Sequence, residues 1–340
     1  MFKGNNKIAD SVSSWGGIAV PSLSTRVTYI VRYKTMVLLV LFSLLLLLSV
    51  HPDGPVFVSA AEVEKTFYLD GDHSREAFWK NGPILPETDR YNRPNQASYF
   101  WRSNGRHPYA EFPSLDSLPM DSFSVAIWVK IETSAAGGVI WDMECKNCID
   151  RCPASVRLVA TKQGAHVFVI PVNKEGDEAL CGLRAQRPRI VNTITRLLTN
   201  TWRHVAVVLD AKSGRFELYV DGKLDGFVEG AVKFDVLAAR TIGNFVVGRQ
   251  VFQGSGAMPA AYDDLRVWNY PISKSTIENL AKVDCQASEW TSWGKCTVNS
   301  PKSYAEKTRT RTIVLQPMNG GKACPTVLHE TEKCDLRINL

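Results

Sequence analysis

Two tryptophans and two arginines near the C-terminus are spaced so that they could stack on one another. Trp290 and Trp293 are three residues apart, and Arg309 and Arg311 are two apart. Residues two apart on an extended strand point to the same face. A guanidinium that lies over an indole gains cation–π energy. The spacing therefore predicts a stacked ladder in place of a hydrophobic core.

The segment that holds these residues, 285–340, is too short to be stable through apolar burial alone. Units of this size need covalent staples, because they bury too little surface to offset the entropy of folding. The segment contains four cysteines, which can supply two disulfides: Cys285, Cys296, Cys324 and Cys334.

The order of these motifs resembles a thrombospondin type-1 repeat. The resemblance rests on the early cysteine, the W-x-x-W-x-x-C run, the T-R-T-R strand, the G-G-K-x-C-P turn and the closing cysteine. It implies a long, three-stranded module in which the tryptophans and arginines interleave, and the bridges Cys285–Cys324 and Cys296–Cys334. Both members of the family's third bridge are absent, because Thr-Val-Asn-Ser follows Cys296 and no sixth cysteine follows Cys334. The interleaved face could be scaffolding alone, or it could also bind a partner.

The same resemblance implies modification of the tryptophans. The spacing of Trp290 and Trp293 is the family's C-mannosylation pattern, with Trp290 the stronger acceptor. O-fucose is not expected, because Asn299 and Ser300 replace the family's acceptor and second cysteine.

The positive charge of the chain is concentrated at its two ends. The formal net charge is +6, with five basic against two acidic residues in 1–60 and eight against five in 285–340. This density is too low for nucleic-acid binding, which needs denser basic stripes. It suits sulfated glycans or an acidic protein surface. The candidate contacts that would leave the ladder intact are Lys295, Lys302, Lys307 and Lys322.

The other four cysteines lie upstream, at Cys145, Cys148, Cys152 and Cys181. We expect them to pair among themselves, in one of three possible connectivities. An even number in each segment favours an oxidising compartment. A zinc cluster of these four residues is the alternative.

Residues 1–60 are interpreted as a leader. The apolar run 37–50 follows Arg26, Arg32 and Lys34 and precedes the small residues Val58-Ser59-Ala60. As a helix the run would span about 21 Å, short of a bilayer core of roughly 30 Å. This pattern favours a signal peptide, with translation starting at Met1 or Met36. An uncleaved signal anchor is the alternative, and only then would the protein be held at a membrane.

Residues 61–284 show short strands separated by turns, which is typical of a sandwich or barrel. Residues 123–130 alternate apolar and polar, 202–210 form a nearly continuous apolar run, and Asp221-Gly222 predicts a hairpin turn. A short helix is expected near 275–280, where Ser275 and Glu278 fit a capping box.

Four blocks of this region resemble the laminin-G-like, concanavalin-A-like (pentraxin-like) jelly roll. They are Phe123-Ser-Val-Ala-Ile-Trp-Val, Trp202-Arg-His-Val-Ala-Val-Val, Leu218-Tyr-Val-Asp-Gly-Lys and Tyr262-Asp-Asp-Leu-Arg-Val-Trp. The predicted chain is therefore all-β: a leader at 1–60, an antiparallel jelly roll at 61–284 and a disulfide-stapled repeat at 285–340.

The jelly-roll resemblance implies binding of glycans or proteins, sometimes beside calcium. The acidic candidates for calcium are Asp263 and Asp264, with Asp70 and Asp72; solvated turn acids are the alternative reading. Calcium needs six to eight oxygens, and it is the one cofactor that we consider. Trp79, Trp101 and Trp141 could stack on sugars or pack in the core.

The sequence favours a binder over an enzyme. Glycoside hydrolases of this fold need paired carboxylates, and the nearest match, Glu175-Gly-Asp177-Glu178-Ala-Leu180, ends in leucine. We expect a secreted adhesion protein that binds glycans or cell-surface proteins, as in animal matrix proteins and apicomplexan invasion adhesins, which combine such modules. A non-catalytic subunit of a secreted or surface complex is the alternative, and a glycoside hydrolase the remote one.

Overall fold

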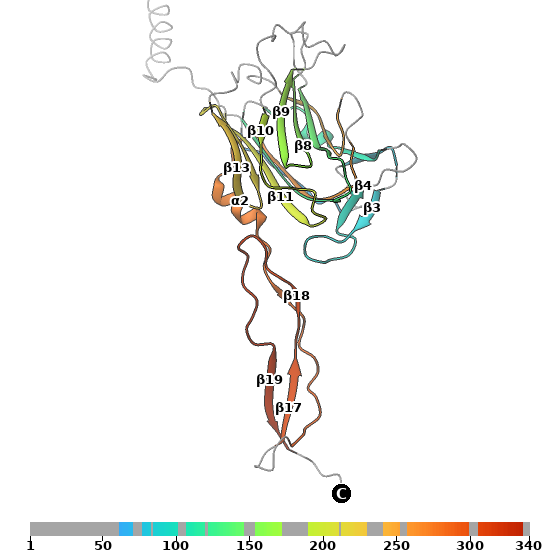
Figure 1. The fold of residues 1–340 in the computed structure, drawn as a ribbon, viewed down its shortest axis with the longest axis vertical. Coiled ribbons are helices and arrows are strands. Elements are labelled where there is room, and N and C mark those ends of the chain that lie inside the picture. The colour runs from blue at the N-terminus through green and yellow to red at the C-terminus, as the bar shows by residue number, and fades with distance from the viewer. Residues whose placement is uncertain are drawn as a thin grey trace, which may run out of the picture. The chain divides into compact units, whose positions relative to one another are not determined.

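The computed structural model shows an antiparallel β-sandwich followed by a small module of paired strands (Figure 1). Residues 60–340 form one compact unit. The structure describes residues 61–70, 77–82, 84–100, 107–119, 122–145, 154–171, 190–210, 212–229, 241–251, 257–298 and 305–335. Several sequence predictions therefore lie outside the described residues: the leader, Cys148, Cys152, Cys181, Asp72, Trp101, Lys302 and the Glu175–Leu180 segment.

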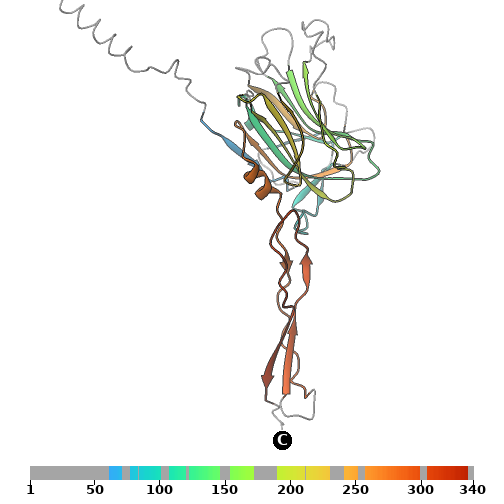
Figure 2. The same cartoon turned by 60° about the vertical axis from the view of Figure 1, so that its left-hand side comes forward.

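The sandwich consists of two antiparallel sheets, as the sequence predicts (Figure 2). The first sheet runs in the order β13 (Lys223–Glu229), β12 (Arg215–Val220), β11 (Trp202–Asp210), β6 (Phe123–Ile131), β15 (Ala260–Trp268), β4 (Ala97–Phe100) and β3 (Ile84–Glu87), and β1 (Glu64–Phe67) also pairs with β15. The second runs β10 (Ile190–Asn192), β9 (Ala165–Pro171), β8 (Ala154–Ala160), β7 (Gly138–Cys145), β14 (Ile242–Val247), β5 (Tyr109–Glu111) and β2 (Phe78–Lys80).

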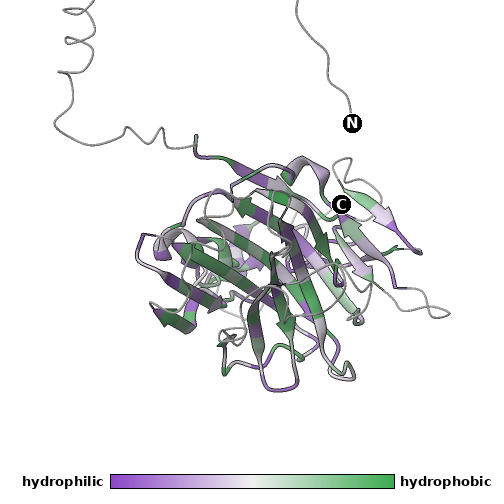
Figure 3. Ribbon diagram, turned by 90° about the horizontal axis from the view of Figure 1, so that it is seen from above, coloured by the Kyte–Doolittle hydropathy of each residue, from purple (hydrophilic) through white to green (hydrophobic). Residues whose placement is uncertain are grey.

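The main core lies between the two sheets, and apolar residues concentrate along the central strands (Figure 3). Odd-numbered residues of β6 and β11 face this core, including Phe123, Ile127, Val205 and Val207. Their even-numbered neighbours face outward, since successive side chains of a strand point to opposite faces. The predicted alternation of residues 123–130 thus reflects a strand with one face in the core.

The outer face of the first sheet is also covered, which explains the nearly continuous apolar run of β11. Ala206 and Val208 are buried there in a second apolar cluster with residues of α2 (Lys274–Ala281) and the turn before it. Ile272 and Ile277, which flank the start of α2, both belong to this cluster. They form a hydrophobic staple that fixes the angle at which the chain enters the helix.

The predicted capping box of α2 is wrong by two residues. The N-cap is Ser273, whose side chain accepts a hydrogen bond from the Thr276 backbone N–H at 3.1 Å. Ser275 lies inside the first turn, and Glu278 pairs with Lys274 at 3.6 Å. The helix begins earlier because Ser124 Oγ accepts from the Ile272 backbone N–H at 3.0 Å and holds the preceding turn against β6.

The C-terminal module consists of two strand pairs and an irregular extended segment, residues 288–297, which we call the first strand. β16 (Gln286–Ala287) pairs with β18 (Ile313–Leu315), and β17 (Ala305–Thr310) pairs with β19 (His329–Cys334). Among the described residues 285–298 and 305–335, Ala305 is the one that is buried. Two disulfides join the strands, Cys285–Cys324 and Cys296–Cys334, the pairing that the repeat resemblance implies.

A glycine is required where the G-G-K turn meets the end of the sandwich. The Val283 and Met318 backbones exchange hydrogen bonds of 3.1 and 2.9 Å. A Cβ at Gly321 would lie 1.9 Å from the Val283 carbonyl oxygen, which no side chain could accommodate without a backbone shift. The turn therefore needs glycine at this position for close backbone approach.

Loss of either disulfide should unfold the repeat selectively. The bridges close loops of 39 and 38 residues, and each loop closure is worth about 4 kcal/mol in the chain-entropy estimate. We expect the double variants Cys285→Ser/Cys324→Ser and Cys296→Ser/Cys334→Ser to lose similar amounts of stability. Protease cleavage within 285–335 at increasing urea measures this loss, and wild-type resistance in either variant would contradict it.

Candidate functional site

The tryptophans and cations of the repeat form one continuous stack. Arg309 lies between the two indoles, with its guanidinium carbon 5.0 Å from the Trp290 ring centre and 4.7 Å from that of Trp293. Arg311 covers the outer side of Trp290 at 4.5 Å, and Lys307 covers Trp293 at 5.0 Å. We call Lys307, Trp293, Arg309, Trp290 and Arg311 the ladder.

A three-to-two spacing of the strands produces the ladder. The first strand bonds to β17 and the residues after it at every third residue: Ser288 N to Thr312 O, Thr291 N to Thr310 O, Gly294 N to Thr308 O and Thr297 N to Glu306 O, all at 2.8 to 2.9 Å. Three residues of the first strand thus advance as far as two residues of β17. Cations two apart on β17 lie roughly 6.6 Å apart, which leaves room for one flat indole between them.

The cations of the ladder also contact oxygen atoms of β19 and of the segment just before it. Arg309 donates to Glu330 at 2.7 Å, and Lys307 pairs with Glu332 at 3.1 Å. Arg311 donates twice to the Val327 carbonyl oxygen, at 3.1 and 2.9 Å. Each cation of the ladder therefore has an oxygen partner as well as an indole face.

The other lysines proposed as contacts differ from Lys307. Lys295 is exposed and makes no ion pair with a described residue, and Lys322 has 88 % of its side chain exposed, 3.7 Å from Asp284. Lys307 is a rung of the ladder and not a free surface cation. Substituting Lys307 would therefore disturb the fold, so Lys307 cannot serve as a clean probe of binding.

The aspartates proposed as calcium ligands are instead bound by an arginine. Arg90 Nη1 donates to Asp263 at 2.7 Å, and Arg90 Nη2 donates to Asp264. No group of three or more His, Cys, Asp or Glu side chains in the described part of the chain could hold a metal ion. Asp70 has other interactions of its own. The Asp263 and Asp264 carboxylates therefore do not fit calcium, because their oxygens are already used by the Arg90 guanidinium and are too few for its shell.

A β-bulge brings the two neighbouring aspartates to one face of β15. The register with β6 passes from Asp263↔Trp128 to Arg266↔Ala126, so β15 gains one residue over its partner. Asp264 is the bulged residue and has a φ of 44°, in the left-handed region. The bulge also reverses the alternation of the strand: Ala260 and Tyr262 face the core before it, and Leu265 and Val267 after it. Without the bulge, consecutive aspartates would point to opposite faces.

An Asx turn presents Arg90 to this bulge. Asp89 Oδ1 accepts from the backbone N–H groups of Tyr91 and Arg93, at 2.9 and 2.8 Å. The turn lies between β3 and β4 and directs Arg90 over the outer face of the first sheet. Its guanidinium carbon lies 4.4 Å from the Tyr91 ring centre and 5.0 Å from that of Trp128.

Two buried groups near Arg90, His204 and Asp263, have shifted pKa values. Burial, with the nearby positive charges of Arg90 and Arg266, lowers the pKa of His204 to about 3. Burial and the adjacent Asp264 raise the pKa of Asp263 to about 7, although Arg90 opposes this shift. His204 is therefore a neutral imidazole at physiological pH. It packs edge-to-face against Trp128 at 5.3 Å, and its Nδ1 is buried without a hydrogen-bond partner among the described residues.

The tryptophans that could have stacked on sugars behave differently from one another. Trp141 is fully buried and stacks on Phe245, so it belongs to the core. Trp79 is partly buried against the same core. For the upstream cysteines, the structure describes only the backbone of Cys145.

Comparison with known families agrees with this architecture. Residues 104–278 match the family described as the concanavalin A-like lectin/glucanases superfamily. The chain belongs to this superfamily. Residues 285–338 match the spondin-like TSP1 domain. Both predicted resemblances are thereby confirmed, together with the all-β sandwich and the disulfide-bonded repeat.

Over its TSP1 region the chain is homologous to spondins. It is 38% identical over 55 residues to spondin-1 of Gallus gallus, covering 16% of this chain and 6% of that protein. It is 44% identical over 50 residues to spondin-2 of Rattus norvegicus, covering 15% of each. The chain thus spans a small part of the curated relatives that it matches.

Solved structures resemble the superfamily domain at low similarity. A SAP-like pentraxin from Limulus polyphemus is 16% identical, with a TM-score of 0.39 over 54% of this chain and 80% of that one. Domain 4 of the arabinanase AbnA from Geobacillus stearothermophilus is also 16% identical, with a TM-score of 0.39 over 64% and 96% of the two chains. Similarity at this level carries no argument about function.

Removal of Arg309 should weaken the repeat more than removal of any other cation, because Arg309 contacts both indoles. Two cation–π contacts at exposed sites are worth about 1–2 kcal/mol together. We expect Arg309→Ala to lower the urea midpoint of protease cleavage within 285–335, and Arg309→Lys to recover only part of the loss, since an ammonium cannot stack as a plane. Lys295→Ala is the matched control. A midpoint for Arg309→Ala equal to that of the control would contradict the ladder.

Removal of Arg90 should destabilise the sandwich. Arg90→Gln would leave Asp263 and Asp264 without their guanidinium partner, and breaking a buried pair costs about 3–5 kcal/mol. Lys80→Gln is the control, because Lys80 is half-exposed and 3.9 Å from Glu111, where a pair contributes less than about 1 kcal/mol. Chemical unfolding of both variants gives the comparison. Equal losses would show that the Arg90 cluster adds no stability.

Proposed function

We propose that this protein is an extracellular, non-catalytic recognition protein whose repeat binds sulfated glycans or an acidic protein surface. The observation that carries the proposal is the exposure of the repeat's charge. Residues 285–340 hold eight basic and five acidic residues, and Ala305 is the one buried side chain among those of the segment that the structure describes. The basic side chains of the described part of the repeat therefore lie at or near its surface, where they can attract a polyanion.

The extracellular part of the proposal is supported by the covalent chemistry and by the relatives. Two disulfides in so small a module suit an oxidising compartment. The module matches the spondin-like TSP1 domain. No helix within the described residues is long and apolar enough to cross a bilayer.

A non-catalytic role is supported by the match to the spondin-like TSP1 domain, while the superfamily of the sandwich is described as including both lectins and glucanases. The segment from Glu175 ends in Leu180 where the E-x-D-x-x-E pattern of such hydrolases has a glutamate, and it lies outside the described residues. Fold alone does not decide between lectins and hydrolases.

A second candidate function is that of a docking subunit in a larger extracellular complex. The repeat exposes three valines by about half of their surface, Val298, Val314 and Val327, at 53, 51 and 52%. Exposed aliphatic residues on a thin module suit a protein partner better than a sulfated glycan. This candidate predicts binding that survives high salt, whereas glycan binding should weaken as salt screens the charges.

Heparin affinity chromatography of the full chain tests the proposal. We expect the triple variant Lys295→Gln/Lys302→Gln/Lys322→Gln to elute at lower salt than wild type, with its repeat still resistant to protease. The control is Lys162→Gln/Lys212→Gln/Lys223→Gln, which removes the same charge from exposed positions of the sandwich. Equal elution of the two triple variants would overturn the role of the repeat.

We also propose that Trp290 is C-mannosylated, with Trp293 the weaker acceptor, and that Thr297 carries no O-fucose. Support comes from the W-x-x-W spacing and the match to the spondin-like TSP1 domain. Mass spectrometry of protein from its native host should show a hexose increment on the tryptic peptide that contains Trp290. An unmodified Trp290, or a deoxyhexose on Thr297, would contradict this prediction.

A further inference from the structure

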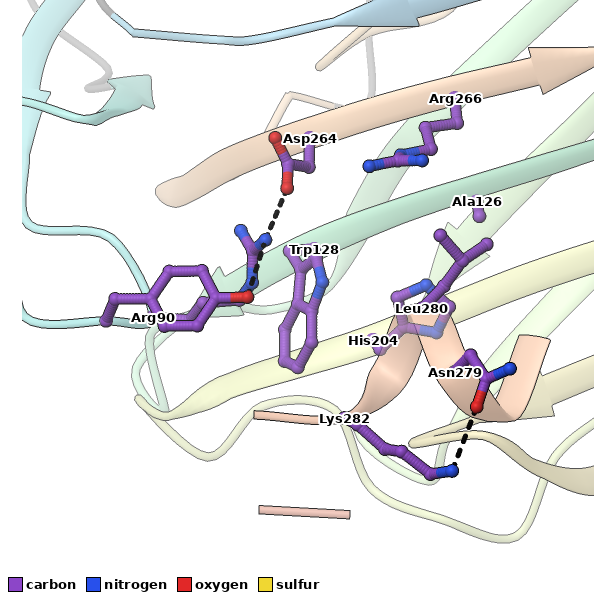
Figure 4. Close-up of a pocket in the computed structure, with 10 residues that line it drawn as sticks. Arg90, Ala126, Trp128, His204, Asp264, Arg266, Asn279, Leu280 and Lys282 are labelled. Carbon is purple, nitrogen blue, oxygen red and sulfur yellow. Dashed lines mark hydrogen bonds and ion pairs between the residues drawn. The ribbon is translucent and has the colours of Figure 1, made fainter. Parts of the chain in front are cut away.

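A small pocket lies on the outer face of the first sheet, remote in sequence from the ladder. Trp128 of β6, His204 of β11 and Arg266 of β15 form its sheet side, and the end of α2 closes it with Asn279 and Lys282 (Figure 4). Its volume is about 130 Å³. Pockets that enclose whole small molecules measure roughly 300–1,000 Å³, so this one suits a single chemical group.

The lining of the pocket is cationic. Arg90, Arg266 and Lys282 line it together with one carboxylate, Asp264. Asp264 and the buried Asp263 are both bound by Arg90. The positive charges of Arg266 and Lys282 are compensated less closely: among the described residues Arg266 pairs with Glu64 alone, at 3.6 Å, and Lys282 donates to the side-chain oxygen of Asn279 at 2.9 Å.

The hydrogen-bonding capacity of these groups is one-sided. A guanidinium has five N–H donors and an ammonium has three, and neither can accept. The Arg266 side chain makes no hydrogen bond to a described residue, and the Lys282 ammonium makes one. Because the Asn279 oxygen accepts from Lys282, the donor end of that amide is left for another partner. The pocket therefore offers donors in excess of acceptors.

The walls of the pocket are held rigid before any ligand enters. Arg90 is fixed by two carboxylates and stacks on Tyr91 and Trp128. The His204 imidazole is buried against Trp128, and its Nδ1 has no hydrogen-bond partner within the described part of the chain. A polar group buried without a hydrogen-bond partner is costly, and such groups are uncommon outside functional sites and bound-water sites.

We propose that this pocket binds a single oxyanion group, a carboxylate or a sulfate, through Arg266, Lys282 and Asn279. An oxyanion carries acceptors only, which matches the excess of donors, and its charge matches the cationic lining. The remainder of the ligand would lie outside, since the pocket has room for the acidic group alone. This site is separate from the lysines of the repeat, so either site can fail its test without deciding the other.

Titration of the full chain with sodium sulfate and with sodium acetate tests the proposal. Binding is observed through the NMR signals of the His204 ring protons. The signal is assigned by its loss in His204→Gln. We expect a saturable shift with a Kd on the order of millimolar, and no such shift with sodium chloride at equal ionic strength. Tighter binding of sulfate would assign a sulfated ligand, and tighter binding of acetate a carboxylated one.

Two variants and a matched control make the test specific. Arg266→Gln and Lys282→Gln should each weaken binding about tenfold, the loss of one charge-assisted hydrogen bond. Lys274→Gln removes one positive charge from the start of α2, outside the pocket, and should leave the Kd unchanged. If Arg266→Gln lowers the unfolding midpoint, the exposed Lys282→Gln decides the result. Absence of a saturable shift, or wild-type affinity in Lys282→Gln, would overturn the proposal.

Discussion

The repeat depends on one constraint: a strand that bonds every third residue runs beside a strand whose side chains repeat every second residue. The hydrogen bonds at Thr291 and Gly294 bring these two periods into register. Each indole then lies between two cations, and Arg309 lies between both indoles. With a single buried side chain in its described part, the module has no hydrophobic core to replace this stack. The disulfides close the ends of the arrangement, while the stack and its ion pairs hold the middle.

In the sandwich, both faces of the first sheet are covered. The inner face packs on the second sheet, and the outer face is covered by α2 over one half. Over the other half, the bulge at Asp264 and the Asx turn at Asp89 bring together a guanidinium and two carboxylates. This cluster lies beside His204 and the end of α2, and the donor-rich pocket forms between them. Recognition by this chain would thus involve surface charge on the repeat and fixed donors on the sandwich.

Local patterns predicted the parts of the structure that depend on neighbours in sequence. The alternation of 123–130, the Asp221-Gly222 turn and the W-x-x-W and T-R-T-R motifs all correspond to observed elements. The errors involve partners far apart in the chain. Asp263 and Asp264 suggested a cation site because Arg90, 173 residues away, carries no local sign of pairing with them. Lys307 was predicted to be a free surface lysine because the expected ladder contained only two tryptophans and two arginines. Its position two residues before Arg309 was a signal that it lies on the same face. The cap of α2 was misplaced because the Ser124 contact that sets it comes from another strand.

Amide-resolved hydrogen exchange of the intact protein tests the central claim, that the three-to-two spacing of the repeat builds the ladder. The amides of Ser288, Thr291, Gly294 and Thr297 donate to the neighbouring strand. The account predicts slow exchange at these four positions and fast exchange at the residues between them, including Trp290 and Trp293. Protection at alternate residues of 288–297 would show an ordinary β-strand. In that case the indoles would point to opposite faces, and the ladder could not exist.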